Sequence, residues 1–392
     1  MAKPDQKLTN PIRNMSPFVR TLKTIRHWIE EGVLQPGERL PSEQDLASRL
    51  NVSRTTIRAV LTTLEEETVV EPLEGRGRVI SPSLPARRRT LRGTLGILNA
   101  RGNIRIPSHH RASGWDDYLP LGILDASSER GWHTLVLSVE RLLEDGVEHL
   151  LSEGLLGILV LNDALNIPSI PSILKVFQKE NLPVIVQSDG FHLEGFDQVL
   201  SDHAAGANDL ATWLIKKDRK RILRLWEIPL IGNYPGWLLD RDRGMESAMQ
   251  EAGLEILPAM LVRNPLIKTE MVHEFELMTH LVAGHLGKFI STGNKFDAIM
   301  ATTDGQVPHI CAALKQLGLI PGKDVIVVGY DDYWADVPEQ AWENTPPAAT
   351  VNKLNGSLGT AMVEALQQRL EHPLLTEPIL TRVRPELKIT DA

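Results

Sequence analysis

Apolar residues recur at helical spacing in the first 80 residues of the chain. A stretch from Phe18 to Ile29 places its apolar side chains on one face, and Pro36 and Gly37 then predict a turn. Ser42 and Ser53 are placed to cap two short helices. The inner face of the second helix consists of Ile57, Val60, Leu61 and Leu64. Two short helices joined by a tight turn predict a helix-turn-helix.

The outer face of the second helix carries chemistry that suits DNA. Arg54, Thr55 and Arg58 lie near its N-terminal end, which a recognition helix presents to the major groove. Two β-like runs then flank residues 73–77, which predicts a hairpin with Arg76 at its tip. A basic hairpin tip fits a minor groove or a phosphate backbone. The alternative is a helical module that binds protein instead of DNA.

From residue 93 onward, short apolar runs alternate with longer amphipathic stretches. Continuous Val, Ile and Leu runs separated by helices predict parallel sheets covered on both faces. The predicted strands are 94–98, 134–137, 157–161, 184–187, 221–225, 298–301 and 325–328. The predicted helices are 116–130, 169–179, 204–217, 243–252, 271–290 and 308–317. A further helical row, Leu354 to Leu370, predicts a core helix or a dimer contact.

Polar residues follow several of these strands, where parallel α/β sheets bind their ligands. Carboxylates, amides, an arginine and flat aromatic rings together suit a sugar. Any one of these residues alone could be a helix cap or a solvated turn. The candidate ligand-binding residues are Asn162, Asp189, Trp237, Arg241, Asp304, Asp331 and Trp334.

Charge is unevenly distributed between the N-terminal part and the rest of the chain. The net charge of the 392-residue chain is −8, which taken alone argues against nucleic acid. Residues 1–92, however, carry 16 Lys and Arg against 11 Asp and Glu, whereas the remaining 300 carry 26 against 39. A Pro-rich basic stretch at 81–92 predicts a linker between a basic module and an acidic one.

Composition and motifs argue against other classes of protein. A single cysteine, Cys311, and the lack of a signal-like or membrane-length apolar run predict a cytoplasmic, nucleoid-associated protein. His273, His280 and His285 do not have zinc-site spacing, and no metal site is expected. Neither a dinucleotide fingerprint nor a nucleophile elbow is present. We therefore expect no catalytic residues and no cofactor.

The N-terminal 80 residues resemble the GntR-type winged-helix DNA-binding domain. The resemblance covers about residues 17–80 and rests on the segments PGERLPSE, VSRTTIR and GRGRVI. It implies DNA contacts from Arg54, Thr55, Thr56, Arg58, Gly75 and Gly77. Gln44, a further candidate contact, stands where the family usually has arginine, and Thr68 stands where a glycine is common.

The C-terminal 300 residues resemble the LacI/GalR-type effector domain, a relative of periplasmic sugar-binding proteins. The segments RDRGMESAMQEAGLE, FDAIMATTDGQVPHI and PGKDVIVVGYDD carry the resemblance. It is clear over about 196–387 and weaker over 93–195, where 101–113 depart from the pattern. It implies effector contacts from Arg241 and Asp304, with Asp331 near the hinge, and two lobes joined by crossovers near 200, 331 and 373. Thr303 replaces a common asparagine, so the effector cannot be transferred from a relative.

Together these observations predict an α/β protein with an N-terminal winged helix-turn-helix. We expect a DNA-binding domain at 1–80, a linker at 81–92 and a two-lobed effector and dimerisation domain at 93–392. The expected function is a homodimeric transcriptional regulator, most simply a repressor, that binds operator DNA and responds to a sugar. An effector-dependent activator or dual regulator and a sugar-acting enzyme or sugar carrier are the alternatives.

Overall fold

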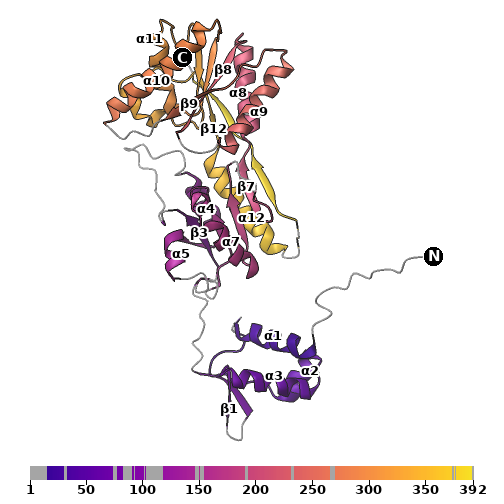
Figure 1. The fold of residues 1–392 in the computed structure, drawn as a ribbon. Helices are drawn as coiled ribbons and strands as arrows, with labels where there is room; N and C mark the ends of the chain where they lie inside the picture. The colour runs from indigo at the N-terminus through magenta and orange to yellow at the C-terminus, as the bar shows by residue number, and fades with distance from the viewer. Residues whose placement is uncertain are drawn as a thin grey trace, which may run out of the picture. The chain divides into compact units, whose positions relative to one another are not determined.

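The computed structural model divides the chain into two compact units, Met1–Thr90 and Leu91–Ala392 (Figure 1). Most of the predicted linker and of the segment 101–113 lies outside the residues that the structure describes. The described residues are 16–30, 33–73, 77–82, 91, 93–100, 102, 118–145, 150, 154–189, 193–230, 234–264, 270–372, 375 and 377–390.

The first unit is a winged helix-turn-helix. Its elements are α1 (Pro17–Glu30), α2 (Glu43–Leu50), α3 (Arg54–Glu66) and an antiparallel pair, β1 (Val70–Leu73) and β2 (Gly77–Ile80). The helices surround one apolar core, which confirms the predicted inner face of α3. The fully buried side chains include Ile25, Leu46, Ile57, Val60, Leu61 and Leu64.

The second unit contains two lobes, each built on a parallel sheet. The lobe 1 sheet has the order β13-β7-β6-β5-β3-β4, and the lobe 2 sheet has the order β11-β10-β8-β9. The lobe 1 strands are β3 (Thr94–Asn99), β4 (His133–Ser138), β5 (Ile158–Val160), β6 (Val184–Gln187), β7 (Asp197–Ser201) and β13 (Leu380–Val383). The lobe 2 strands are β8 (Ile222–Pro229), β9 (Met260–Asn264), β10 (Ala298–Ala301) and β11 (Ile326–Val328).

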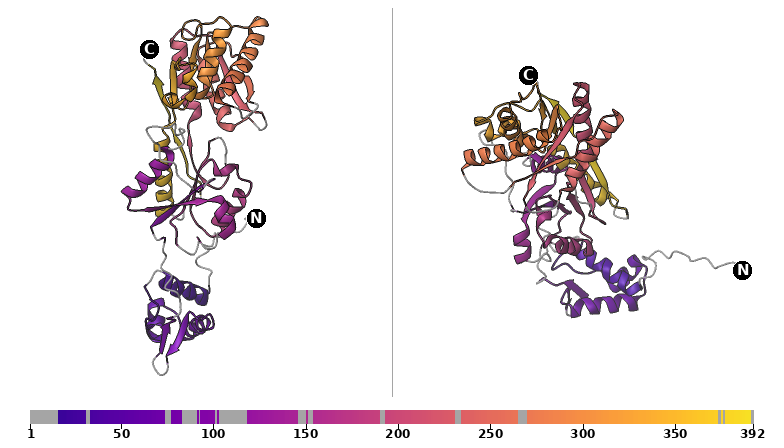
Figure 2. Two further views of the ribbon diagram at one scale, coloured as in Figure 1. Left: turned by 90° about the vertical axis from the view of Figure 1, so that its left-hand side faces the viewer. Right: turned by 45° about the horizontal axis from the view of Figure 1, so that its top comes forward.

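Helices cover both faces of each sheet, as the continuous apolar strands predict (Figure 2). In lobe 1, α4 and α12 pack on one face and α5 and α7 on the other. In lobe 2, α8 and α9 pack on one face and α10 and α11 on the other. Their bounds are α4 (Tyr118–Glu129), α5 (Val139–Asp145), α7 (Ile170–Lys179), α8 (His203–Lys216), α9 (Gly236–Glu251), α10 (Met271–Ser291), α11 (Val307–Gln316) and α12 (Asn355–Glu371).

The chain passes between the lobes at three places (Figures 1 and 2). The first crossover, between β7 and α8, lies near the expected residue 200. The others were expected near 331 and 373, but the structure has them at 353–354 and 384–385. The reason is an antiparallel pair at lobe 2, β12 (Ala349–Asn352) with β14 (Glu386–Ile389), that the sequence pattern does not predict.

Helix α9 differs from its predicted form in a way that affects the candidate site, whereas the row that begins at Leu354 forms the core helix that its spacing predicts. The helix expected at 243–252 begins at Gly236, so Trp237 and Arg241 lie within its first two turns. A Cβ on Gly244 would lie 1.9 Å from the carbonyl oxygen of Ala204, so only glycine allows α8 and α9 to cross this closely. The row that begins at Leu354 is helix α12, and its Leu358, Met362 and Leu366 are buried in the lobe 1 core.

Candidate functional sites

Helix α3 presents an exposed polar face at its N-terminal end. Ser53 caps the helix by accepting the backbone N–H of Thr56 at 3.1 Å, as its position predicts. Arg54, Thr55 and Arg58 are exposed, and Thr56 is half-buried. Gln44, on α2, is also exposed. These side chains are therefore accessible to a partner, and their DNA contacts stay predictions.

The carboxylate of Glu43 forms ion pairs with the arginines at this face. Oε2 of Glu43 lies 3.0 Å from Nε of Arg58 and 3.9 Å from Arg54, while Oε1 accepts from Arg78 at 3.0 Å. Arg78 also pairs with Glu65. The hydrogen bond from Arg78 lowers the pKa of Glu43, so the carboxylate is ionised at neutral pH. Three guanidinium groups share two carboxylates, so this cluster keeps an excess of positive charge.

The hairpin after α3 agrees with the predicted wing in its strands. Gly77, at the start of β2, has a φ of +96°, and its neighbours Gly75 and Arg76 lie outside the described residues. Thr68, which stands where the family commonly has glycine, adopts a φ of +58°. A β-branched residue rarely adopts this conformation, so the turn into the wing keeps the glycine-like backbone despite the substitution.

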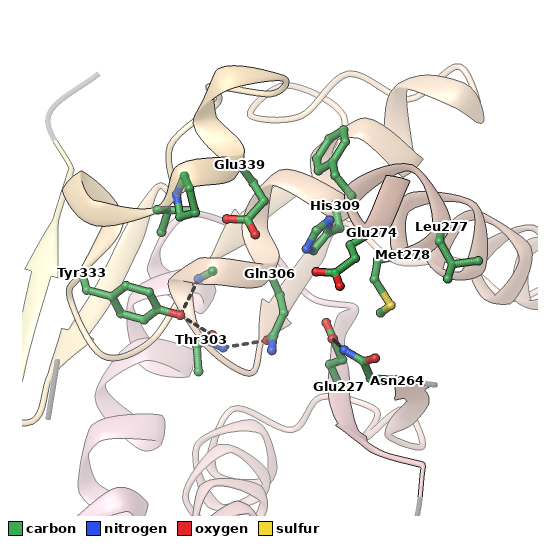
Figure 3. Close-up of a pocket in the computed structure, with 14 residues that line it drawn as sticks. Glu227, Asn264, Glu274, Leu277, Met278, Thr303, Gln306, His309, Tyr333 and Glu339 are labelled. Carbon is green, nitrogen blue, oxygen red and sulfur yellow. Dashed lines mark hydrogen bonds between the residues drawn. The ribbon is translucent and has the colours of Figure 1, made fainter. Parts of the chain in front are cut away.

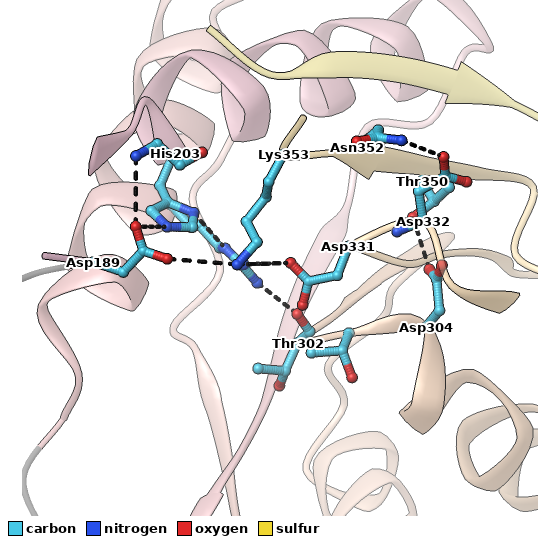
Figure 4. A network of polar contacts seen from close by, with 12 residues as sticks. Asp189, His203, Thr302, Asp304, Asp331, Asp332, Thr350, Asn352 and Lys353 are labelled. Atoms are coloured by element: carbon cyan, nitrogen blue, oxygen red, sulfur yellow. Dashed lines mark hydrogen bonds and ion pairs between the residues drawn. The ribbon is translucent and has the colours of Figure 1, made fainter. Parts of the chain in front are cut away.

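In the second unit, a buried network of charged side chains joins the two lobes (Figure 4). Asp189 follows β6 of lobe 1, and Asp331 follows β11 of lobe 2. Nζ of Lys353, at the second crossover, lies 3.5 Å from Oδ2 of Asp189 and 3.7 Å from Oδ1 of Asp331. All three residues are at most 7 % exposed. The ammonium group thus bridges one carboxylate from each lobe.

Arg241 completes the network from α9. Its NH2 lies 3.4 Å from Oδ1 of Asp331, and its NH1 donates to the carbonyl oxygen of Thr302 at 2.5 Å. Its Nε donates to Nδ1 of His203 at 3.3 Å, so Nε2 of that imidazole carries the proton and faces Asp189 at 3.6 Å. The guanidinium also stacks over the rings of Tyr330 and Trp237, at 3.4 and 4.5 Å from the centroids.

Burial and neighbouring charges determine the pKa values of Asp189 and His203 in this network. Burial alone would raise the pKa of Asp189, but the charge of Lys353 and the His203 contact outweigh it and lower the pKa. Burial lowers the pKa of His203, and the cationic neighbours Arg241 and Lys353 add to that effect. The network at neutral pH therefore contains two carboxylates, two cations and a neutral imidazole, and its charges balance.

Asp304 follows β10 and lies beside the network, next to a turn after β11 that holds the backbone under strain. Its Oδ1 accepts from the hydroxyl of Thr350 at 2.7 Å and its Oδ2 from the N–H of Tyr333 at 2.9 Å. Burial raises the pKa of Asp304 to about 7, and the charges of Asp331 and Asp332 add to the shift. Those two residues have φ values of +85° and +53°, in the left-handed region that favours glycine.

The structure gathers some of the candidate effector residues and separates others. Asp189, Arg241 and Asp331 belong to the network, and Trp237 packs against it. Trp334 instead packs against the apolar core of lobe 2. Oδ1 of Asn162, after β5, is buried without a hydrogen-bond partner among the described residues. The roles of these residues toward a ligand stay predictions.

Sequence reasoning missed two members of the network, His203 and Lys353. Each follows a strand that was not predicted, β7 and β12 respectively, and each lies at a crossover between lobes. The apolar runs Val199–Leu200 and Ala349–Val351 are the signals that would have found those strands.

A separate cavity of about 460 Å³ lies in lobe 2, at the carboxyl ends of β8, β9 and β10 (Figure 3). Its lining includes Thr303, which directly precedes Asp304, and Tyr333, in the turn that carries Asp331. The hydroxyls of Thr303 and Tyr333 lie 2.9 Å apart, and the N–H of Gly305 donates to Tyr333 at 3.0 Å. Glutamates 227, 274 and 339 also line the cavity.

Two kinds of site are absent from the part of the chain that the structure describes. No group of three or more His, Cys, Asp or Glu side chains is arranged to hold a metal ion there. Among the same residues, no helix is both long and apolar enough to cross a membrane.

Comparison with known proteins defines the class of each unit. Residues 20–80 match the family described as bacterial regulatory proteins, gntR family, so the first unit carries a GntR-type helix-turn-helix domain. The second unit has the fold of LacI-family regulators. A LacI-family transcriptional regulator from Enterococcus faecium with bound ribose covers 76 % of this chain and 98 % of its own, with a TM-score of 0.52 and 18 % identity.

Two repressors are similar to this chain in sequence. The arabinose metabolism transcriptional repressor of Geobacillus stearothermophilus is 20 % identical over 97 % of this chain and 98 % of its own length. The ribose operon repressor of Escherichia coli strain K12 is 26 % identical over 65 % of this chain and 72 % of its own. The first similarity spans both units of this chain.

Proposed function

We propose that this chain is a transcriptional repressor whose affinity for operator DNA is changed by a sugar bound between the lobes of its second unit. The observation that carries the proposal is the buried network of Asp189, Arg241, Asp331 and Lys353, which joins the lobes through groups that also bind hydroxyls. The similarity to arabinose and ribose repressors supports both the repressor function and the sugar class.

The DNA-binding part of the proposal follows from the surface of α3. Arg54 and Arg58 are exposed next to the N-terminus of the helix, where guanidinium groups reach guanine edges or phosphates. We propose a homodimer that places two such helices on a two-fold operator. We also propose a cytoplasmic regulator without enzymatic activity, with no cofactor other than the effector.

The response to sugar follows from the balance of the network. Hydroxyl groups can accept from Arg241 and Lys353 and donate to Asp189 and Asp331, so a bound sugar replaces direct contacts between the lobes. Only a difference in sugar affinity between two lobe arrangements can shift their populations. Such a coupling is typically about 1–3 kcal/mol, or roughly 5–150-fold in DNA affinity.

The test uses the full chain and a DNA site selected by it from random duplexes. Operator binding is titrated by gel shift with and without ribose, arabinose and other monosaccharides. Arg241→Lys is compared with Arg243→Lys, because Arg243 lies two residues further along the same helix with its side chain 73 % exposed.

We expect the active sugar to weaken operator binding by wild type and by Arg243→Lys, and to have little effect on Arg241→Lys. An unchanged sugar response in Arg241→Lys would refute the assignment of the effector site. A sugar that strengthens operator binding would instead make the protein respond to a co-repressor or act as an activator.

A further inference from the structure

The cavity in lobe 2 has a wall of carboxylates. Glu227 comes from β8, Glu274 from the first turn of α10, and Glu339 from the short 3-10 helix η6 (Pro338–Ala341). Of the described residues that line the cavity, none is a lysine or an arginine. Figure 3 shows the side chains of Glu227, Glu274 and Glu339 directed into the same space. The chemistry of this wall therefore favours a positively charged group.

The carboxylates act on one another across the cavity. Burial raises the pKa of Glu227 to about 7, and the charge of Glu339 adds to the shift although Asn264 donates to Glu227 at 2.8 Å. Burial also raises the pKa of Glu339, and the charge of Glu274 adds to it. A cation in the cavity would relieve this repulsion, since it would stabilise the ionised form of each glutamate.

A buried imidazole gives an independent indication that the cavity holds a ligand. His309 is only 8 % exposed, and its Nδ1 has no hydrogen-bond partner among the described residues. Figure 3 shows its ring between Gln306 and Glu274, facing the cavity. Burial lowers the pKa of His309 to about 4, so the imidazole is neutral and does not compensate the carboxylates. The imidazole has a hydrogen bond with the backbone of Phe275, but its Nδ1 has no partner among the described residues, which leaves one ring nitrogen for a group that is not part of the chain.

The rest of the lining suits hydroxyl groups. Oε1 of Gln306 accepts from the backbone N–H of Thr303 at 2.9 Å, which leaves the amide NH2 as a donor. The hydroxyls of Thr303 and Tyr333 are a paired donor and acceptor on the opposite wall. The volume of about 460 Å³ lies within the range of small-molecule sites, roughly 300–1,000 Å³.

We infer that this cavity binds a hydroxylated ligand that carries a protonated amine, which is the chemistry of an amino sugar. The inference rests on the proposed function, because it extends the effector site between the lobes into this cavity and assigns the cavity to the charged group of the effector. The cavity and the inter-lobe network meet at Tyr333, whose N–H donates to Asp304 and whose ring borders the cavity. The cavity thus borders, through Tyr333, the turn that carries Asp331.

The test measures binding to the full chain by calorimetry at pH 6.5, with glucosamine and glucose as a matched pair that differs in one charged group. A double variant, Glu227→Gln with Glu339→Gln, removes two carboxylates but keeps their shape. Glu276→Gln, an exposed residue of α10 that does not line the cavity, is the control.

We expect glucosamine to bind wild type and Glu276→Gln about tenfold or more tightly than glucose, since charge-assisted hydrogen bonds exceed neutral ones by that order. The preference should disappear in the double variant through a loss of glucosamine affinity. Equal binding of the two sugars to wild type, no binding of glucosamine, or a preference that survives in the double variant would each overturn the inference.

Operator binding separates this inference from the function on which it rests. If a neutral sugar releases the operator while glucosamine does not bind, the inference fails and the proposed function stands. If glucosamine binds with the expected dependence on Glu227 and Glu339 but neither it nor any other sugar changes operator binding, the sugar-responsive regulator fails and the amine site stands.

Discussion

The arginine cluster at α3 and the network between the lobes both consist of ion pairs, but the first is exposed and the second is buried. Arg58 has a side chain that is 64 % exposed, whereas Arg241 is 2 % exposed. In the first unit, Glu43 and Glu65 do not balance Arg54, Arg58 and Arg78, so this cluster keeps a positive charge. In the second unit, Asp189 and Asp331 balance Lys353 and Arg241.

This difference indicates what each cluster can do. An exposed ion pair contributes little to stability, so the arginines of α3 can leave Glu43 for a phosphate or a base without a large cost to the fold. A buried ion pair is different, because the removal of one partner leaves the other charge desolvated and uncompensated. The first cluster is suited to an external anion, and the second couples lobe positions to whatever enters between them.

The largest expected effect comes from breaking the buried network. Lys353→Met should lower the free energy of unfolding of the second unit by about 3–5 kcal/mol, because Asp189 and Asp331 lose the cation that bridges them. Tryptophan fluorescence during urea unfolding reports mainly on this unit, since seven of the eight tryptophans lie within residues 91–392.

The control for that experiment is Lys388→Met, which removes an exposed lysine paired with Glu386 at 2.8 Å. Its effect should stay within roughly 0.5 kcal/mol. If the two lysine variants unfold at the same urea concentration, the network does not stabilise the fold and the contrast between the clusters is wrong.

A second experiment uses the pH dependence of the same region. Asp304 is an acid whose pKa rises from 3.8 to about 7 on folding, so the folded protein binds its proton more strongly than the unfolded chain. Its contribution to stability is therefore present at low pH and is lost as the pH rises toward 7. Between pH 5 and pH 8, the free energy of unfolding of wild type should fall by roughly 2–3 kcal/mol relative to Asp304→Asn.

Chemical unfolding at a series of pH values measures whether the free energy of unfolding falls in this way. Asp336→Asn, an exposed change a few residues after the turn that carries Asp331 and Asp332, should give the pH profile of wild type. A difference between wild type and Asp304→Asn that stays constant with pH would mean that Asp304 keeps an ordinary pKa in the folded protein.

The sequence predicted the fold well where strands are buried on both faces. The runs 184–187 and 298–301 match β6 and β10, because every side chain of these strands is apolar or enclosed. The pattern is weaker at the sheet margins, where β13 and β14 carry exposed residues at both ends or in alternation. Since β12 and β14 were not predicted, two of the three crossovers were placed too early in the chain.

The sequence likewise predicts some residues of the candidate sites and misses others. Arg54 and Arg58 can be identified from the sequence of α3 alone, because the helical spacing of its apolar residues shows which positions are exposed. Asp189 and Asp331 follow predicted strands and could be proposed from that rule alone. Lys353, in contrast, reaches the network only through a crossover after β12, and no local pattern indicates that it lies between Asp189 and Asp331.

A third experiment tests the exposed cluster. Arg58→Ala should weaken operator binding by about 1–3 kcal/mol and leave stability within roughly 0.5 kcal/mol of wild type. Lys220→Ala, which removes an exposed cation from the second unit, should leave DNA affinity unchanged. Operator binding that survives Arg58→Ala at full strength would mean that α3 does not read the DNA.

The smallest expected effect separates backbone strain from DNA contact within the first unit. Thr68 adopts a φ of +58° between α3 and the wing, and its hydroxyl donates to the neighbouring carbonyl of Glu67 at 2.7 Å. Thr68→Gly should stabilise the first unit by about 1 kcal/mol, because glycine adopts this conformation without steric strain although its unfolded state has more entropy. Hydrogen exchange of the α3 amides measures the change without interference from the second unit. If Thr68→Gly lowers protection instead, the threonine contributes contacts that outweigh its strain. Since Thr68 is not a candidate DNA contact, operator affinity should stay at the wild-type value, in contrast to Arg58→Ala.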